Sequence, residues 1–223
     1  MLRGFFILLV RLLTGASAVW QGCEPRSGKL RIYFANHGSH LDFVTLWAAL
    51  PEELRGRTRG VAARDYWGGS RFRRFVAADI FNALLIRREG ITKDDNPVAQ
   101  MEAALRAGDS LIIFPEGTRS RDGTIGTFKP GLYHLAARVP EAELVPVFLQ
   151  NLNRILPKGH LLPIPLISTV VFGRPLRIEE GEGKKAFMER AQATVSALGQ
   201  GNRPSDARGA AADANGRTSI EVC

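Results

Sequence analysis

The chain is poor in cysteine, with two in 223 residues: Cys23 near the start and Cys223 at the very end. Two distant thiols build neither a disulfide framework nor a cysteine-based zinc site, and this usage favours a reducing compartment. The sequence also lacks the glycine-rich patterns that bind nucleotides, the H-E-x-x-H pattern of zinc hydrolases and the G-x-S-x-G pattern of serine hydrolases. We therefore expect a protein that uses no cofactor and no metal.

A long, uninterrupted apolar run is missing as well. Residues 4–20 (GFFILLVRLLTGASAVW) are mostly apolar, but they are short for a membrane span and carry Arg11 near the middle. On a helical wheel Arg3 and Arg11 share one stripe, and bulky apolar side chains cover the rest. This pattern predicts an apolar membrane-associating helix over residues 1–22 that lies in the interface. A core helix, a true span and a cleaved signal peptide are the alternatives.

Positive charge is in excess, with 30 Lys+Arg against 22 Asp+Glu and a net charge of +8. Such an excess favours a phosphorylated substrate, anionic lipid or nucleic acid as partner, but no motif that reads nucleic acid is present, so we expect none. Residues 55–74 hold seven arginines interleaved with aromatic residues, which suits an anionic membrane surface. The alternatives are a solvated surface helix and a segment whose aromatic residues enter the core.

Strand-like and helical patterns alternate along the chain. We expect strands at residues 30–35, 111–114, 144–149 and 168–172, and helices at 41–50, 97–107, 131–138 and from Phe187 to Leu198, where Gly199 ends the last one. This order predicts an α/β domain over residues 23–198, with a central mixed sheet flanked by helices. Residues 199–223 contain few bulky apolar side chains and are predicted to form a disordered tail.

A first polar motif, NHGSHLD at residues 36–42, follows the first of these strands. His37 and Asp42 form an H-x4-D pair across the turn into a helix. A carboxylate in the first helical turn can fix one ring nitrogen as a donor and leave the other free to act as a base. The alternative is that Ser39 and Asp42 form a helix capping box, which would explain Asp42 without catalysis.

A second polar motif, FPEGTRS at residues 114–120, follows another apolar strand. Gly117 would let a ligand approach the backbone closely, and Thr118, Arg119 and Ser120 offer donors suited to phosphate oxygens. Taken alone, the motif is also compatible with an ordinary polar turn. Two such loops, each after an apolar strand, predict a shared site at one edge of the sheet.

NHGSHLD and FPEGTRS, about 80 residues apart, resemble the two signature blocks of the glycerolipid acyltransferases typified by 1-acylglycerol-3-phosphate acyltransferase. The resemblance covers roughly residues 30–178. It implies that His37 is the general base and that Asp42 orients it. It also implies that Glu116, Gly117, Thr118 and Arg119 hold the acceptor, with Arg119 near its phosphate.

A third block of the family, G-x-x-F-I-x-R, resembles NALLIRR at residues 82–88. Arg88 matches the arginine that binds phosphate in the family. Asn82 and Leu85 stand where the family usually has Gly and Phe.

The resemblance implies acyl transfer from a thioester to the free hydroxyl of 1-acyl-glycerol-3-phosphate, giving phosphatidic acid in phospholipid biosynthesis. The co-substrate would be acyl-CoA or acyl-carrier-protein. The expected partners are therefore a lysolipid acceptor, a thioester donor and an anionic membrane surface, with acyl carrier protein as a further partner if it carries the donor acyl chain. The alternatives are another lysophospholipid or amino-lipid acceptor, and an inactive membrane-bound lipid-binding scaffold. We expect the protein on the cytoplasmic face of a membrane, attached monotopically or peripherally.

Overall fold

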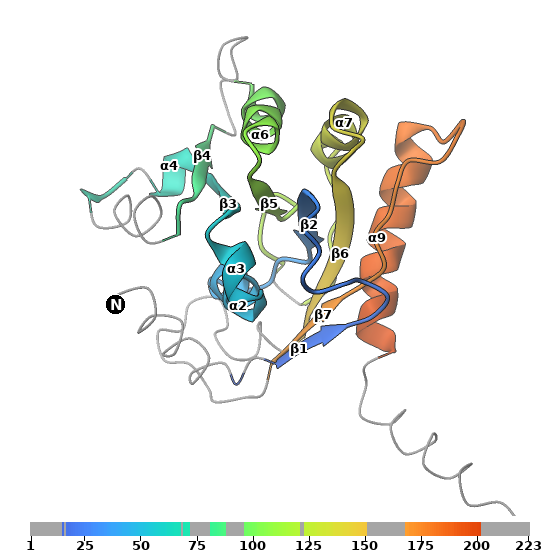
Figure 1. The fold of residues 1–223 in the computed structure, drawn as a ribbon, viewed down its shortest axis with the longest axis horizontal. Helices are drawn as coiled ribbons and strands as arrows, with labels where there is room; N and C mark the ends of the chain where they lie inside the picture. The colour runs from blue at the N-terminus through green and yellow to red at the C-terminus, as the bar shows by residue number, and fades with distance from the viewer. Residues whose placement is uncertain are drawn as a thin grey trace, which may run out of the picture.

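A seven-stranded sheet forms the centre of the computed structural model, which describes residues 15, 17–67, 69–71, 81–87, 96–120, 123–150 and 168–201. The strand order is β1-β7-β6-β2-β5-β3-β4 (Figure 1). Neighbouring strands are parallel except β6 and β7. The predicted mixed α/β sheet is therefore confirmed. The strands are β1 Ser17–Trp20, β2 Arg31–Ala35, β3 Thr58–Ala63, β4 Leu84–Ile86, β5 Ser110–Ile113, β6 Glu143–Gln150 and β7 Thr169–Phe172.

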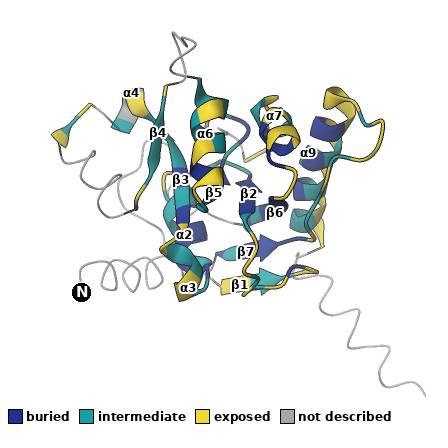
Figure 2. Ribbon diagram, turned by 45° about the horizontal axis from the view of Figure 1, so that its top comes forward, coloured by how far each residue is buried: buried dark blue, intermediate teal, exposed yellow. Residues whose placement is uncertain are grey.

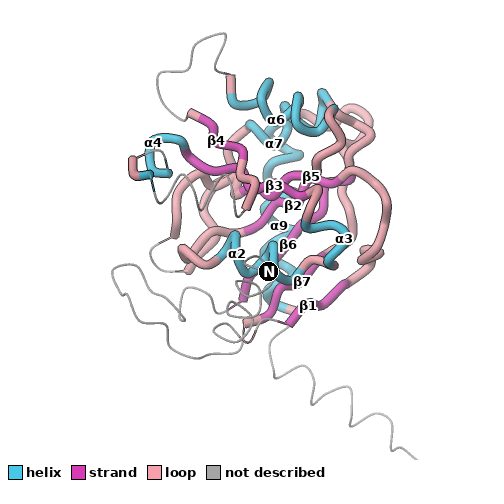
Figure 3. Tube along the Cα trace, turned by 60° about the vertical axis from the view of Figure 1, so that its left-hand side comes forward, coloured by secondary structure: helices cyan, strands magenta, loops and turns pink. Residues whose placement is uncertain are grey.

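Helices cover both faces of the sheet. The described ones are α2 Asp42–Ala49, α3 Glu52–Arg55, α4 Arg64–Trp67, α6 Pro97–Arg106, α7 Gly131–Arg138 and α9 Lys184–Gln200. The α6 and α7 helices lie on one side of the strands, and α2 and α3 lie on the other (Figure 3). The α9 helix packs on the same face as α6 and α7. The chain thus forms a three-layer α/β arrangement.

The two cores follow from the two-residue period of the strands. In β2, Ile32 and Phe34 pack with α6, α7 and α9, whereas Tyr33 and Ala35 pack against α2. All five residues of β2 are buried, as expected for a central strand covered on both faces (Figure 2). This rigid central strand ends immediately before the first polar motif.

Two of the predicted helices, α6 and α7, begin where the sequence indicates. The α6 helix starts at Pro97, and the side chain of Asn96 caps it by accepting a hydrogen bond from the backbone N–H of Val98 at 2.9 Å. The α7 helix spans the predicted residues 131–138.

The predicted membrane-associating helix over residues 1–22 is wrong for its C-terminal part. Ser17–Trp20 forms strand β1, which pairs in parallel with β7, and Trp20 stacks on Phe172 with ring centroids 3.8 Å apart. The sheet therefore includes residues that we assigned to a membrane-associating helix, because a partner strand about 150 residues away satisfies their backbone groups. Residues 1–14, which carry the rest of that prediction, lie outside the described residues. Within the described ranges, no helix is long and apolar enough to cross a bilayer.

The last helix continues past the glycine that we expected to end it. The α9 helix runs to Gln200, and Gly199 lies against the ring of Phe148, where a Cβ atom would come within 2.5 Å of the ring. Gly199 is thus an interior helix residue that allows close contact with the sheet. The predicted disordered tail lies, from residue 202 on, outside the described residues.

Candidate active site

The two polar motifs meet at one edge of the sheet. Strands β2 and β5 are parallel neighbours, with Phe34 opposite Ile113, so the segments that follow them leave at the same edge. The backbone N–H of Ser120 donates to the carbonyl oxygen of His37 at 2.8 Å. The two motifs therefore lie together at this edge, as predicted.

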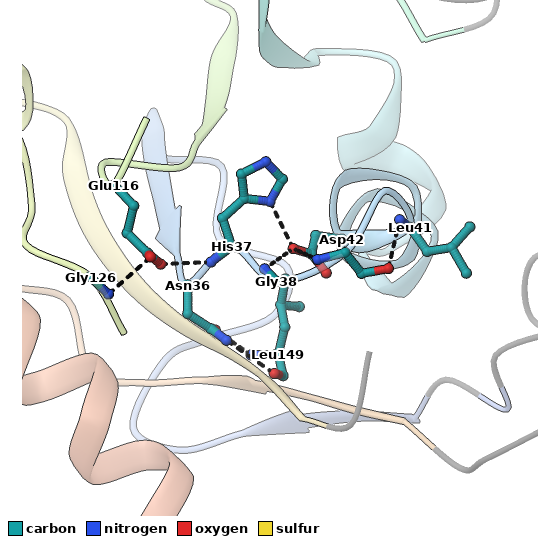
Figure 4. Close-up of polar contacts among 9 residues, drawn as sticks. Asn36, His37, Gly38, Leu41, Asp42, Glu116, Gly126 and Leu149 are labelled. Atoms are coloured by element: carbon teal, nitrogen blue, oxygen red, sulfur yellow. Dashed lines mark hydrogen bonds and ion pairs between the residues drawn. The ribbon is translucent and has the colours of Figure 1, made fainter. Parts of the chain in front are cut away.

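His37 and Asp42 are in direct contact. Nδ1 of His37 lies 2.8 Å from Oδ2 of Asp42, the first residue of α2 (Figure 4). The same oxygen accepts the backbone N–H groups of Gly38 at 2.7 Å and Ser39 at 2.9 Å. Because an ionised carboxylate only accepts, this contact favours the imidazole tautomer in which Nδ1–H donates to Asp42 and Nε2 is the acceptor. The predicted contact is confirmed, and the catalytic role stays a prediction.

Of the two hydrogen bonds in the capping box that we considered for Ser39 and Asp42, the structure shows the one that Asp42 accepts. Asp42 accepts the backbone N–H of Ser39, as the reciprocal bond of a capping box does. The hydroxyl oxygen of Ser39 accepts from the backbone N–H of Leu41 at 3.2 Å, and Leu41 rather than Ser39 stands at the N-cap position of α2. One carboxylate therefore orders the turn and contacts the imidazole ring.

The second loop fixes the position of His37. Its ring stacks on Phe114, with centroids 4.4 Å apart and an interplanar angle of 22°. Its backbone N–H donates to Oε1 of Glu116 at 2.7 Å. The side chain remains 23% exposed, and Nε2 points away from Asp42 (Figure 4). Contacts from both motifs thus hold the imidazole ring in one orientation.

Glu116 joins three segments of backbone. Its second oxygen, Oε2, accepts the backbone N–H of Gly126 at 2.9 Å while Oε1 binds that of His37. Burial raises the pKa of the Glu116 carboxyl, and the two backbone hydrogen bonds oppose that rise. Glu116 is therefore a brace between the two loops, and its contact with the acceptor stays a prediction.

The remaining predicted residues differ in their surroundings. Gly117 has a φ of 72°, which explains the glycine, and Thr118 is exposed. Arg119 is half-buried, and its Nη1 atom is buried without a hydrogen-bond partner among the described residues. An unpaired guanidinium nitrogen beside the loop is suited to an anionic group of a substrate. Arg88 lies outside the described residues.

The departure from the family pattern at Asn82 preserves the backbone. Asn82 has a φ of 49°, in the left-handed region that favours glycine and that asparagine tolerates best among other residues. Its carbonyl oxygen accepts a hydrogen bond from Nε of Arg59 at 3.0 Å. Asparagine in place of glycine therefore keeps the turn that leads into β4.

The described part of the arginine-rich segment 55–74 is not one continuous surface helix, because residues 58–63 form β3. Four of its arginines donate to backbone carbonyl oxygens of neighbouring segments, so part of its positive charge has a structural role. These bonds are Arg55 to Leu50, Arg57 to Gly108, Arg59 to Asn82 and Arg64 to Leu85.

Sequence reasoning gave no role to several residues that shape the site. The side chain of Asn36 exchanges two hydrogen bonds with the backbone of Leu149, at 2.8 and 3.2 Å, and so ties the first motif to β6. Phe114 supplies the ring under His37, and Gly126 closes the brace at Glu116. Asn36 and Phe114 stand inside the two motifs, and that position was the available signal. In the described part of the chain, no group of His, Cys, Asp and Glu side chains is placed to hold a metal.

The protein is thus an α/β protein with two paired polar loops at one edge of its sheet. The chain belongs to the acyltransferase family, whose model matches residues 23–150. It is similar to 1-acyl-sn-glycerol-3-phosphate acyltransferase of Limnanthes douglasii, at 32% identity over 181 residues. That match covers 77% of this chain and 59% of the relative.

It is also similar to 1-acyl-sn-glycerol-3-phosphate acyltransferase LPAT1, chloroplastic, of Arabidopsis thaliana, at 30% identity over 136 residues. That match covers 60% of this chain and 36% of the relative, so the chain spans only part of the length of both proteins. The fold is that of the 1-acyl-sn-glycerophosphate (LPA) acyltransferase PlsC from Thermotoga maritima, with a TM-score of 0.63 at 20% identity. The structural match covers 88% of this chain and 80% of PlsC.

Proposed function

We propose that the protein transfers an acyl chain from a thioester to the free hydroxyl of 1-acyl-glycerol-3-phosphate and so forms phosphatidic acid. The observation that carries the proposal is the contact of Asp42 with Nδ1 of His37, which leaves Nε2 pointing away from the carboxylate, beside a loop whose Arg119 has an unpaired nitrogen. Acyl transfer to an alcohol needs a base at the hydroxyl, and a phosphorylated acceptor needs a cation nearby. The names of the relatives support the same acceptor.

In the proposed reaction, Nε2 of His37 removes the hydroxyl proton as the oxygen attacks the thioester carbonyl. The tetrahedral intermediate then expels the thiolate, and the imidazolium returns the proton to sulfur. Asp42 stabilises the imidazolium through the bond to Nδ1. Arg119 and Arg88 bind the acceptor phosphate. Neither a metal nor an acyl-enzyme enters these steps.

Release of free thiol by the purified protein tests this proposal directly. We expect the highest kcat/KM with 1-acyl-glycerol-3-phosphate and a value lower by about 10- to 100-fold for monoacylglycerol, which leaves the cations unpaired. A panel of zwitterionic lysolipids and amino lipids covers the other acceptors, and acyl-CoA and acyl-carrier-protein are compared as donors. An equal kcat/KM with a zwitterionic lysolipid would contradict the proposed acceptor. No thiol release with any pair of donor and acceptor would indicate an inactive scaffold.

We further propose that the protein works at the cytoplasmic surface of a membrane, attached by residues 1–14 and by arginines of the segment 55–74. A lysolipid acceptor and a diacyl product both partition into bilayers, whereas a thioester of coenzyme A or carrier protein is soluble. One contribution to attachment is hydrophobic and the other electrostatic, so we expect high salt to release only part of the protein from anionic vesicles.

Deleting residues 1–14 should make this binding fully sensitive to salt. The deletion ends there because β1 begins at Ser17, and a longer truncation would remove an edge strand and the Trp20–Phe172 stack. The unfolding midpoint of the truncated protein serves as the control. Complete release of the intact chain by salt alone would argue against a hydrophobic anchor.

A further inference from the structure

A loop outside both signature motifs lies against the second motif. The backbone N–H of Lys129 donates to the carbonyl oxygen of Pro115 at 2.8 Å, and Gly126 donates to Glu116. The next residue back, Phe128, is buried, and its ring meets Phe34 edge-on at a centroid distance of 6.3 Å. The backbone at Lys129 and just before it is therefore tied to the second motif.

The side chain of Lys129 crosses the face of Gly117. A Cβ atom on Gly117 would lie 2.6 Å from Nζ, 2.8 Å from Cε and 3.1 Å from Cδ of Lys129. Glycine at position 117 thus meets two requirements, a positive φ and the space that the lysine occupies. The lysine end lies over the loop that the sequence assigns to the acceptor.

The ammonium group of Lys129 is available to a ligand. Lys129 is exposed, and no ion pair or hydrogen bond joins its side chain to another described residue. Glu116, the acidic residue of the adjoining loop, is buried with each oxygen bound to a backbone N–H. Two residues after Gly117, Arg119 also has an unpaired nitrogen. Two cations thus flank one loop without a described anionic partner.

We propose that Lys129 is a second cation of the acceptor site, which binds the phosphate of the lysolipid together with Arg119; this inference rests on the proposed function. A phosphate monoester carries about −1.5 to −2 charges near pH 7, so a single guanidinium leaves part of that charge unpaired. Lys129 supplies a point charge, while Arg119 supplies a planar donor. The missing side chain at Gly117 leaves room for the ammonium beside the loop. The phosphates of a coenzyme A donor share this chemistry, and the experiment separates the two sources.

Kinetics of Lys129→Met test the proposal, because methionine keeps much of the stem and removes the charge. We expect KM for 1-acyl-glycerol-3-phosphate to rise about tenfold, with kcat within about twofold of the wild type and KM for the donor unchanged. Monoacylglycerol turnover should not change, and Lys129→Arg should restore most of the affinity. Lys184→Met, at an exposed lysine at the start of α9, is the matched control. A rise in donor KM alone would assign Lys129 to the donor and overturn the proposal.

Binding of glycerol 3-phosphate, followed as an increase in Tm, provides a measurement that does not depend on turnover. We expect it to stabilise the wild type and Lys184→Met, and to stabilise Lys129→Met at about tenfold higher concentration. Equal stabilisation of wild type and Lys129→Met, or none of the wild type, would overturn the assignment. Failure of the proposed function is distinct: the wild type would then bind glycerol 3-phosphate through Lys129 without turning over the lysolipid.

Discussion

Replacing His37 by alanine is expected to lower kcat by at least two orders of magnitude while the protein still folds. Alanine has no group that can take a proton from the acceptor hydroxyl, and a positioned base contributes about 10²- to 10⁴-fold to rates of this kind. The backbone contacts of residue 37 with Glu116 and Ser120 do not need the imidazole, so the loop should keep its shape. Thiol release and the unfolding midpoint measure the two effects separately.

His40→Ala is the matched control, since His40 is exposed and lies three residues further along the same turn. We expect it to keep most of the activity. If His37→Ala retained more than about a tenth of wild-type kcat, general-base catalysis at this position would be wrong.

Sequence patterns predicted the elements whose signals are local. The α6 helix is specified by Asn96 as a cap and Pro97 at its first position, and both are neighbours of the helix that they start. The central strand β2 is specified by an apolar run that two layers of helices bury. In these cases a few adjacent residues contain the information.

The elements that the sequence did not predict depend on distant partners. Ser17–Trp20 becomes a strand because β7 pairs with it, and nothing in the apolar segment 4–20 distinguishes that end from a helix. Gly199 stays helical because Phe148, on β6, fills the space beside it. A glycine signals the end of a helix only when no packing partner requires the glycine.

The candidate site likewise contains contacts that local sequence predicts and contacts that depend on distant partners. The H-x4-D spacing predicted the contact between His37 and Asp42, because five residues and a helix start determine that geometry. The contact of Glu116 with the backbone of His37 joins residues 79 positions apart and follows from the pairing of β2 with β5. Motif recognition placed Glu116 at the site, but only the topology reveals what its oxygens bind.

Replacing Asp42 by asparagine should also lower kcat by about a hundredfold or more, with a smaller effect on KM. The amide oxygen can still accept the backbone N–H groups of Gly38 and Ser39, so the turn keeps two of its hydrogen bonds. A neutral amide cannot stabilise the imidazolium that forms when His37 takes the proton. The amide nitrogen would also occupy the place of Oδ1, which is buried without a partner among the described residues.

Ser39→Ala separates catalysis from ordering of the turn. It removes the hydroxyl that accepts the backbone N–H of Leu41, at a cost of about 0.5–1.5 kcal/mol in the free energy of unfolding, and leaves the carboxylate in place. We expect this variant to lose stability but to keep kcat within a few-fold of the wild type. Asp42→Asn should instead lose kcat even at temperatures well below its unfolding midpoint. A kcat for Asp42→Asn within tenfold of the wild type, measured on folded protein, would reduce Asp42 to a residue that only orders the start of α2.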